Sequence, residues 1–409
     1  MSNEFSRRDF LKSGAIIALG VATPPWLAKL AKADMLKVAQ GGKISPDNIL
    51  VVCQLTGGND GLNTVVPYSD SNYYRLRPTL GLKEDAVIKV NESLGFHPAM
   101  SGFKEVFDSK NAAVIHNVGY PNPNRSHFVS MEIWQTADPD GKETYGWLGR
   151  YLDSQMKQGS ANPVMALGIS RQSPTAIRGK AANVPCFASL ADITSFVGDP
   201  DAEKILRDVQ GMEKGEGSSA KVVRDANITA LDAMSELNKA LKSYESKFIY
   251  ANDAFGQGFK QIANLIAVSP KTRVYYFSAG GFDTHAQQSQ QHERLMKGFS
   301  DALAVFMNEM KAINKDKKVT VLVFSEFGRR CYENNSAGTD HGAGAPMFVV
   351  GGNVKGGFIG DKPDLVNLDR GDLQWKIDFR QVYATVIDQW MGGDSASIFG
   401  RKFEHVSLF

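Results

Sequence analysis

The chain has 409 residues, of which 22% are charged and 43% are hydrophobic, with 39 glycines and 16 prolines. This composition is typical of a globular protein and excludes the collagen-like, coiled-coil and disordered classes. The 46 basic residues nearly balance the 44 acidic ones, and no basic block with interleaved aromatic residues occurs, so we expect no nucleic-acid partner. Cys53, Cys186 and Cys331 lie far apart, which leaves no cysteine cluster for a metal and at most one disulfide.

Residues 1–33 have the order of a twin-arginine signal peptide. Arg7 and Arg8 precede a weakly apolar run over residues 14–27, and Ala-Lys-Ala follows at residues 31–33. This pattern predicts export to the periplasm or the medium, with the twin-arginine translocation machinery as a partner. A membrane anchor is the alternative, but the run is shorter than the roughly 20 apolar residues that span a bilayer. We therefore expect no stable membrane span in the mature protein, and cleavage or retention of the peptide stays open.

Short β-branched runs alternate with longer stretches of helical period through the rest of the chain. This pattern predicts an α/β fold with a doubly wound, mostly parallel sheet flanked by helices. We expect residues 34–409 to form one domain, with insertions at about 137–270. The predicted strands are Ile49–Leu55, Ala112–Asn117, Arg273–Ser278, Val319–Phe324 and Met347–Val350.

Three stretches are expected to be helical. Apolar residues recur every three or four positions from Leu295 to Ile313, which predicts a crossover helix on the sheet. An amphipathic stretch over residues 220–267 predicts one or two helices, and residues 378–390 predict a terminal helix. Gly211–Ser219 is the best candidate for a flexible connector.

Polar side chains follow four of the predicted strands, where a doubly wound sheet gathers its ligands. These loops cover residues 56–64, 124–127, 280–285 and 325–329, and residues 339–344 lead into the last predicted strand. Carboxylates and imidazoles are the ligands of Zn²⁺, Mn²⁺, Mg²⁺ and Ca²⁺, so the loops predict a site for one or two divalent ions. The candidate metal ligands are Asp60, Asp283, His285, Glu326, Asp340 and His341.

Ser126 and Arg125 are the candidate catalytic residues. A hydroxyl at a helix N-terminus suits a nucleophile, and the neighbouring guanidinium suits a phosphoryl oxygen. Each motif also has a structural reading, since Ser126 alone is typical of a helix cap and the glycine-rich loop alone is typical of a turn. His127 stays ambiguous, and His116 is expected in the core or behind the ligands. A shared site is favoured because four separate loops carry such residues.

At these motifs the sequence resembles the DUF1501 family of exported bacterial proteins, over essentially the whole mature chain. The resemblance implies kinship with the alkaline phosphatase/sulfatase superfamily, in which an α/β sheet holds one or two divalent metals. It implies that Asp60 is the first-strand metal carboxylate, Ser126 the nucleophile and His341 the late histidine, with Asp283 and His285 as one metal pair and Glu326 serving the other metal. The motifs that carry it are residues 55–64, 73–78, 125–128, 281–285, 325–329 and 340–342.

Two departures from that superfamily matter. Well-studied members place an Asp-His pair where this chain has Ser325-Glu326, so the second metal site is altered or absent. Residues 124–127 also lack the proline and the spacing of the signature for formylglycine, which disfavours a formylglycine sulfatase.

The leading hypothesis is an exported metal-dependent hydrolase that acts on a phosphate, phosphonate or sulfate ester of a small molecule or a polymer. The alternative is a non-catalytic periplasmic binding or assembly protein that retains the fold. A redox enzyme is a third possibility, weakened because the chain lacks a GxGxxG fingerprint and cysteine clusters.

Overall fold

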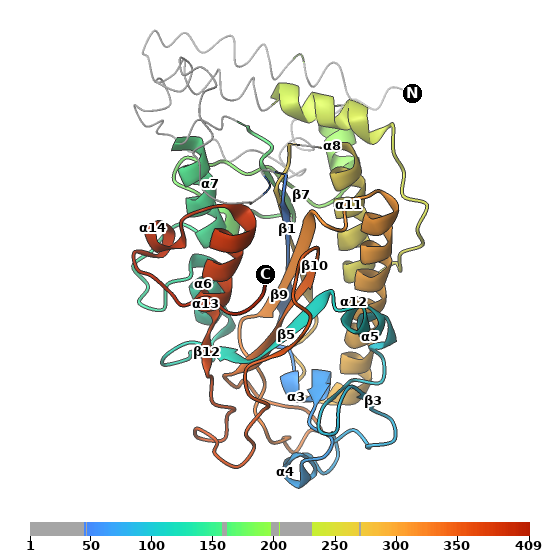
Figure 1. The fold of residues 1–409 in the computed structure, drawn as a ribbon, viewed down its shortest axis with the longest axis vertical. Coiled ribbons are helices and arrows are strands. Elements are labelled where there is room, and N and C mark those ends of the chain that lie inside the picture. Colours follow the sequence, from blue (N-terminus) through green and yellow to red (C-terminus); the bar gives the residue numbers. More distant parts are fainter. Residues whose placement is uncertain (1–44, 46, 158–161, 198–203, 205–230, 270) are drawn as a thin grey trace, which may run out of the picture.

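The computed structural model describes residues 45, 47–157, 162–197, 204, 231–269 and 271–409 (Figure 1). The predicted signal peptide and the predicted connector Gly211–Ser219 lie outside these residues. Among the helices of the described ranges, none combines the length and the apolar character needed to cross a membrane.

A mixed, mostly parallel sheet forms the middle layer, as the sequence pattern predicted. Its order in the described chain is β11-β5-β10-β9-β1-β8-β6-β7, with β12 paired to β5. The antiparallel member is β10, which runs against β5 and β9. All five predicted strands are present, most of them a residue or two longer than expected. The strands are β1 (Ile49–Thr56), β5 (Ala112–Gly119), β6 (Ala166–Ile169), β7 (Cys186–Phe187), β8 (Val274–Gly280), β9 (Val319–Ser325), β10 (Ala345–Gly351), β11 (Gly357–Ile359) and β12 (Ile377–Asp378).

Helices cover both faces of the sheet (Figure 1). One face carries α5 (Ser101–Asp108), α11 (Ala254–Val268) and α12 (Gln288–Ala312), and the other carries α6 (His127–Thr136), α7 (Trp147–Lys157) and α13 (Phe379–Thr385). The predicted crossover and terminal helices are thus confirmed as α12 and as α13 with its π-helical continuation η2 (Val386–Met391). Further helices are η1 (Thr175–Ile177), α8 (Leu190–Val197), α14 (Ser395–Phe399) and a helix over residues 231–241.

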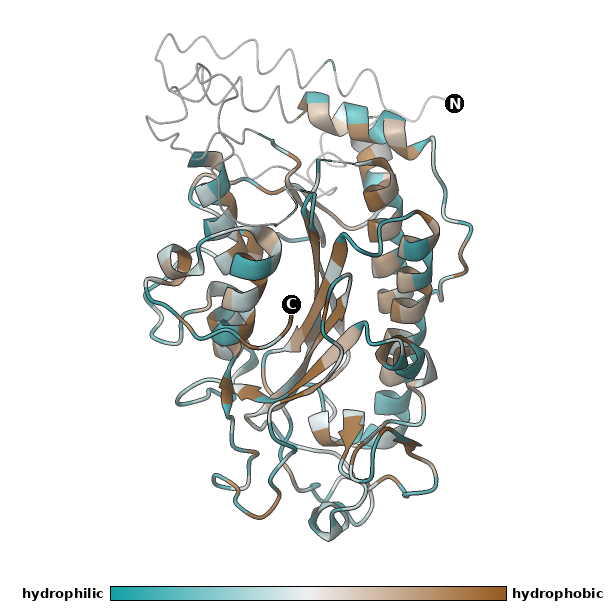
Figure 2. Ribbon diagram, viewed as in Figure 1, coloured by the Kyte–Doolittle hydropathy of each residue, from teal (hydrophilic) through white to brown (hydrophobic). Residues whose placement is uncertain are grey.

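Strand β1 is buried on both faces because side chains alternate across a sheet. Val51 and Cys53 pack under α5, α11 and α12, whereas Leu50 and Val52 pack under α6, α7 and α13. Hydrophobic residues accordingly line the strands and the inner sides of the helices (Figure 2). Two separate apolar layers therefore hold the central strands, and the polar ends of those strands are left to build a site.

A small lobe extends from one end of the sheet. It has a three-stranded sheet of order β2-β4-β3 and a core that includes Leu62, Tyr73 and Leu373. Its elements are α3 (Gly61–Thr64), β2 (Val65–Val66), α4 (Ser71–Leu76), β3 (Ile88–Lys89) and β4 (Gly95–Phe96).

The carboxyl ends of β1, β5, β8 and β9 meet at one edge of the sheet. Strands β8 and β9 are parallel to β1, and β5 has the direction of β9 because both run against β10. The antiparallel direction of β10 also brings the segment before it to this edge. The loops that carry the candidate polar residues therefore lie next to one another in space.

Candidate metal centre

The loops after β1 and β8 approach each other closely at this edge. Gly57 has φ +120°, and a Cβ atom built on it would lie 2.4 Å from the backbone nitrogen of Asp283. Only a residue without a side chain fits both this conformation and this distance. The glycine-rich loop thus does more than turn the chain, because it lets the β8 loop carry Asp283 toward the centre.

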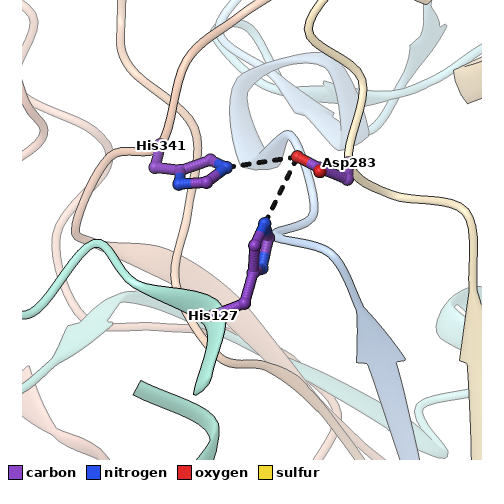
Figure 3. A group of neighbouring side chains, drawn as sticks. All are labelled: His127, Asp283 and His341. Atoms are coloured by element: carbon purple, nitrogen blue, oxygen red, sulfur yellow. Dashed lines mark hydrogen bonds and ion pairs between the residues drawn. The ribbon is translucent and has the colours of Figure 1, made fainter. Parts of the chain in front are cut away.

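Three imidazoles converge on one oxygen of Asp283. Its Oδ1 lies 3.1 Å from Nε2 of His341, 3.0 Å from Nε2 of His285 and 3.3 Å from Nε2 of His127. Figure 3 shows His127 and His341 pointing at this carboxylate from two different segments of the chain. The ligand atoms of His127, Asp283 and His341 all lie within 4.8 Å of one another.

The outer nitrogen of each imidazole has an oxygen partner. Nδ1 of His341 lies 2.7 Å from the carbonyl oxygen of Arg125, which can only accept, so this nitrogen carries the proton. Nδ1 of His127 donates to Oε1 of Glu326 at 2.9 Å, and Nδ1 of His285 donates to Oδ1 of Asp340 at 3.1 Å. The Arg125 carbonyl therefore assigns the Nδ1–H tautomer to neutral His341. In neutral His127 and His285 the same tautomer donates to Glu326 and Asp340 and leaves Nε2 available to an ion.

This tautomer leaves three Nε2 lone pairs facing a carboxylate oxygen. The Nε2 atoms of His285 and His341 are 2.9 Å apart, and within the described residues the buried Nε2 of His127 makes no hydrogen bond. Acceptors at such distances repel one another unless protons or a cation lie between them. Ligand atoms about 3.3 Å apart also match the edge of a tetrahedron around Zn²⁺ at about 2.0–2.1 Å. The donor set therefore fits a divalent metal.

Glu326 fixes the orientation of His127 through Nδ1, the ring nitrogen that faces away from Asp283. Its side chain is fully buried, and Oε1 also accepts from the backbone nitrogen of Gly57 at 2.8 Å. The hydrogen bond from His127 to Glu326 raises the pKa of His127 against the opposing effect of burial. A carboxylate in this position fixes the ring and makes the opposite nitrogen more basic.

Arg329 places a fixed cation against Asp283. Its buried Nη2 lies 2.6 Å from Oδ1 of Asp283. Burial alone would raise the pKa of Asp283, but the hydrogen bond and the positive charge of Arg329 outweigh it and hold that pKa well below its ordinary value. Asp283 is therefore a carboxylate at neutral pH.

Asp60 belongs to a neighbouring buried network. Its Oδ2 pairs with Nη1 of Arg77 at 2.5 Å and accepts from Gln288, while Oδ1 caps α3 at the backbone nitrogen of Asn63. Although burial alone would raise the pKa of Asp60, the Arg77 guanidinium lowers it. His292 lies in the same network, with Nε2 3.4 Å from the hydroxyl of Thr64. Both oxygens of Asp60 are thus already engaged by protein donors.

Ser126 directly precedes α6 and is the neighbour of His127 in the sequence. It is exposed, and within the described residues its hydroxyl has no hydrogen-bond partner. Its neighbours on both sides belong to the site, through the Arg125 carbonyl and the His127 ring. The Arg125 guanidinium pairs with Asp372, so it is not free in this arrangement.

Of the six predicted ligands, the structure brings Asp283, His285 and His341 together. Glu326 and Asp340 accept hydrogen bonds from the outer nitrogens of His127 and His285. Asp60 lies in a separate network, paired with Arg77. The structure adds His127, which sequence reasoning left ambiguous. The available signal was its place next to Ser126 at a helix start, but a lone histidine there gives no direction for its ring. Phe327 packs against the rings of His127 and His341, with centroids 4.9 and 4.7 Å away.

An open hollow of about 440 Å³ lies beside residues 75–79 and 333–337 and is lined mainly by polar side chains. Its wall includes Arg75, Thr79, Glu333 and Asn334. The Asn334 amide donates to Oδ1 of Asp340 at 3.1 Å, which links this wall to His285.

Several solved structures share features of this fold at low similarity. The C-terminal periplasmic domain of EcEptC from Escherichia coli, solved with zinc, has a TM-score of 0.37 and 9% identity, covering 76% of this chain and 75% of that one. Alkaline phosphatase from the Antarctic bacterium TAB5 has a TM-score of 0.32 and 14% identity, covering 76% and 93%. PsFucS1 sulfatase from Pseudoalteromonas sp. has a TM-score of 0.34 and 9% identity, covering 78% and 65%. Scores this low carry no argument about activity.

No curated protein matches the sequence. A family model described as "Protein of unknown function (DUF1501)" matches residues 47–401, which is most of the chain. The chain therefore belongs to the DUF1501 family.

Proposed function

We propose that this protein is a metal-dependent hydrolase of phosphate, phosphonate or sulfate esters. The observation that carries the proposal is the convergence of three imidazole lone pairs on the ionised Asp283, an arrangement that calls for a cation. His127, Asp283 and His341 would hold the ion, with His285 beside them. When bound, a divalent ion stabilises the negative charge that develops on the oxygens of a reacting ester.

Ser126 is the proposed nucleophile. It lies between two residues that contact or form the centre, and its exposed hydroxyl is unengaged within the described chain. In the proposed reaction, Ser126 Oγ bonds to the phosphorus or sulfur atom while the bond from that atom to the ester oxygen breaks. The ester oxygen leaves as the alcohol and takes up the proton that the Ser126 hydroxyl gives up. Water then releases the group from the serine. The hollow beside Asn334 supports this function as a place for the alcohol part of the substrate.

Elemental analysis combined with an ester screen tests this function. The wild type is expected to hold a divalent metal that a His127→Ala, His341→Ala double variant loses. Ser126→Ala is expected to keep the metal and lose at least about 100-fold in kcat, because covalent catalysis has lost its nucleophile. Ser109→Ala is the matched control, since this exposed serine lies before β5, at the opposite edge of the sheet.

Unchanged turnover in Ser126→Ala would assign the attack to another group. A folded wild type that holds no divalent metal and takes none up would favour the non-catalytic binding or assembly protein instead. Export through the twin-arginine route stays a prediction of Arg7 and Arg8, as does a single domain over residues 34–409.

A further inference from the structure

All three side-chain nitrogens of Arg329 donate to the protein. Nε donates to the carbonyl of Gly58 at 2.9 Å and Nη1 to that of Thr339 at 2.8 Å. Nη2 donates to the carbonyls of Gly57 and Phe282 and to Asp283. The guanidinium is fully buried, so it joins three loops and keeps a permanent positive charge at the centre.

The two other carboxylates that could bind a second metal ion already accept hydrogen bonds from the protein. Asp60 is buried and bound by Arg77, Gln288 and the backbone nitrogen of Asn63. Glu326 is buried and accepts from His127 and from the backbone nitrogen of Gly57. A second ion at either group would have to displace protein donors from a buried carboxylate, which is costly for buried polar groups.

The charges at the centre balance with one ion. Among the groups that contact the imidazoles or Asp283, the carboxylates Asp283, Glu326 and Asp340 are negative and Arg329 is positive. The three imidazoles are neutral when they act as ligands, so these groups have a net charge of minus two. The Asp60–Arg77 pair adds nothing to this charge because its members cancel. One divalent cation neutralises these groups, whereas a second would leave an excess of positive charge beside the buried Arg329.

We infer that the centre takes one divalent ion per chain, and that Arg329 supplies the fixed positive charge in place of a second ion. This inference rests on the proposed function. The Arg329 guanidinium is fully buried and does not reach a substrate, so it is a positioning residue that acts through Asp283.

The number of bound ions is the first test. EDTA-treated full-length protein, titrated with Zn²⁺ and analysed calorimetrically and by elemental analysis, is expected to bind one equivalent that the His127→Ala, His341→Ala variant does not bind. Two equivalents, both lost in that variant, would overturn the inference while leaving a metal-dependent hydrolase in place. No bound equivalent would overturn both.

A pair of variants isolates the charge of Arg329. Arg329→Lys and Arg329→Gln both lose the five-bond arrangement, but only the lysine keeps a positive charge. We expect folded Arg329→Gln to bind Zn²⁺ at least about tenfold more tightly than folded Arg329→Lys, because a cation a few ångströms away repels the ion. Equal affinity of two folded variants would show that Arg329 only joins loops. If either variant fails to fold, the wild-type stoichiometry still decides the inference.

Discussion

At the scale of single residues, the outer hydrogen bonds of three histidines decide what their inner nitrogens can do. Nδ1 of His127 donates to the Glu326 carboxylate, and Nδ1 of His285 donates to the Asp340 carboxylate. Nδ1 of His341 donates to the carbonyl oxygen of Arg125. The lone pairs on Nε2 are left to face Asp283. Glu326 is the most buried of these partners and also binds the β1 loop, so it couples the orientation of His127 to the fold.

Glu326→Gln tests this coupling. The amide keeps the shape of the side chain but removes the charge that makes His127 basic, so Zn²⁺ affinity is expected to fall by about 10- to 100-fold. Calorimetric titration measures the change, with circular dichroism to establish folding. Glu132→Gln, at an exposed position of α6, is the control and is expected to bind as the wild type does. Wild-type affinity in folded Glu326→Gln would remove Glu326 from the metal centre.

At the scale of elements, α12 is longer than its apolar period predicted. The pattern starts at Leu295, whereas the helix starts at Gln288 because its first two turns serve the polar network. Gln288 binds Asp60 and Thr339, and His292 contacts Thr64. The polar side chains that make these contacts do not follow the apolar period from which the helix was predicted.

The other end of α12 anchors the segment that precedes α11. The hydroxyls of Tyr244 and Tyr250 donate to the two oxygens of the buried Glu309 at 2.7 and 2.5 Å. Burial and the neighbouring Glu309 carboxylate raise the pKa of Tyr244 to about 12. This pair of hydrogen bonds holds residues 242–253 against the helix.

Tyr250→Phe is expected to lower the free energy of unfolding by about 1–3 kcal/mol, because a buried carboxylate loses a donor. Urea unfolding followed by circular dichroism measures this loss. Tyr145→Phe should change it by less than about 0.5 kcal/mol, since the Tyr145 hydroxyl has no hydrogen-bond partner in the described part of the chain. A Tyr250→Phe variant as stable as the wild type would mean that packing alone holds the segment.

At the scale of the whole molecule, the sheet brings charges from distant parts of the chain to one edge. The antiparallel β10 returns His341 to the edge where β1, β8 and β9 end. With one divalent ion, the centre formed by Asp283, Glu326, Asp340 and Arg329 is neutral. A neutral centre favours a substrate with one negative charge over one with two, because the second charge must be desolvated without a matching cation.

The charge preference can be measured with three esters of the same leaving group. We expect 4-nitrophenyl sulfate or bis(4-nitrophenyl) phosphate to be accelerated at least about tenfold more than dianionic 4-nitrophenyl phosphate, each relative to its uncatalysed rate. Assays at pH 8 with one equivalent of Zn²⁺ provide the comparison. A larger acceleration of the dianion would contradict the charge balance assigned to Arg329.

The sequence by itself determined the α/β class, the five central strands and the loops that carry the site. It could do so because β-branched runs, helical periods and turn residues are local patterns. The tertiary structure alone decided the role of each side chain. Arg77 reaches Asp60 across 17 positions, and Arg329 reaches Gly57 across 272. Such partners are chosen by the packing of loops at a sheet edge, and no local pattern encodes that packing. For the same reason, the sequence did not show that the His127 ring lies against Asp283, or that Asp60 forms a buried ion pair with Arg77.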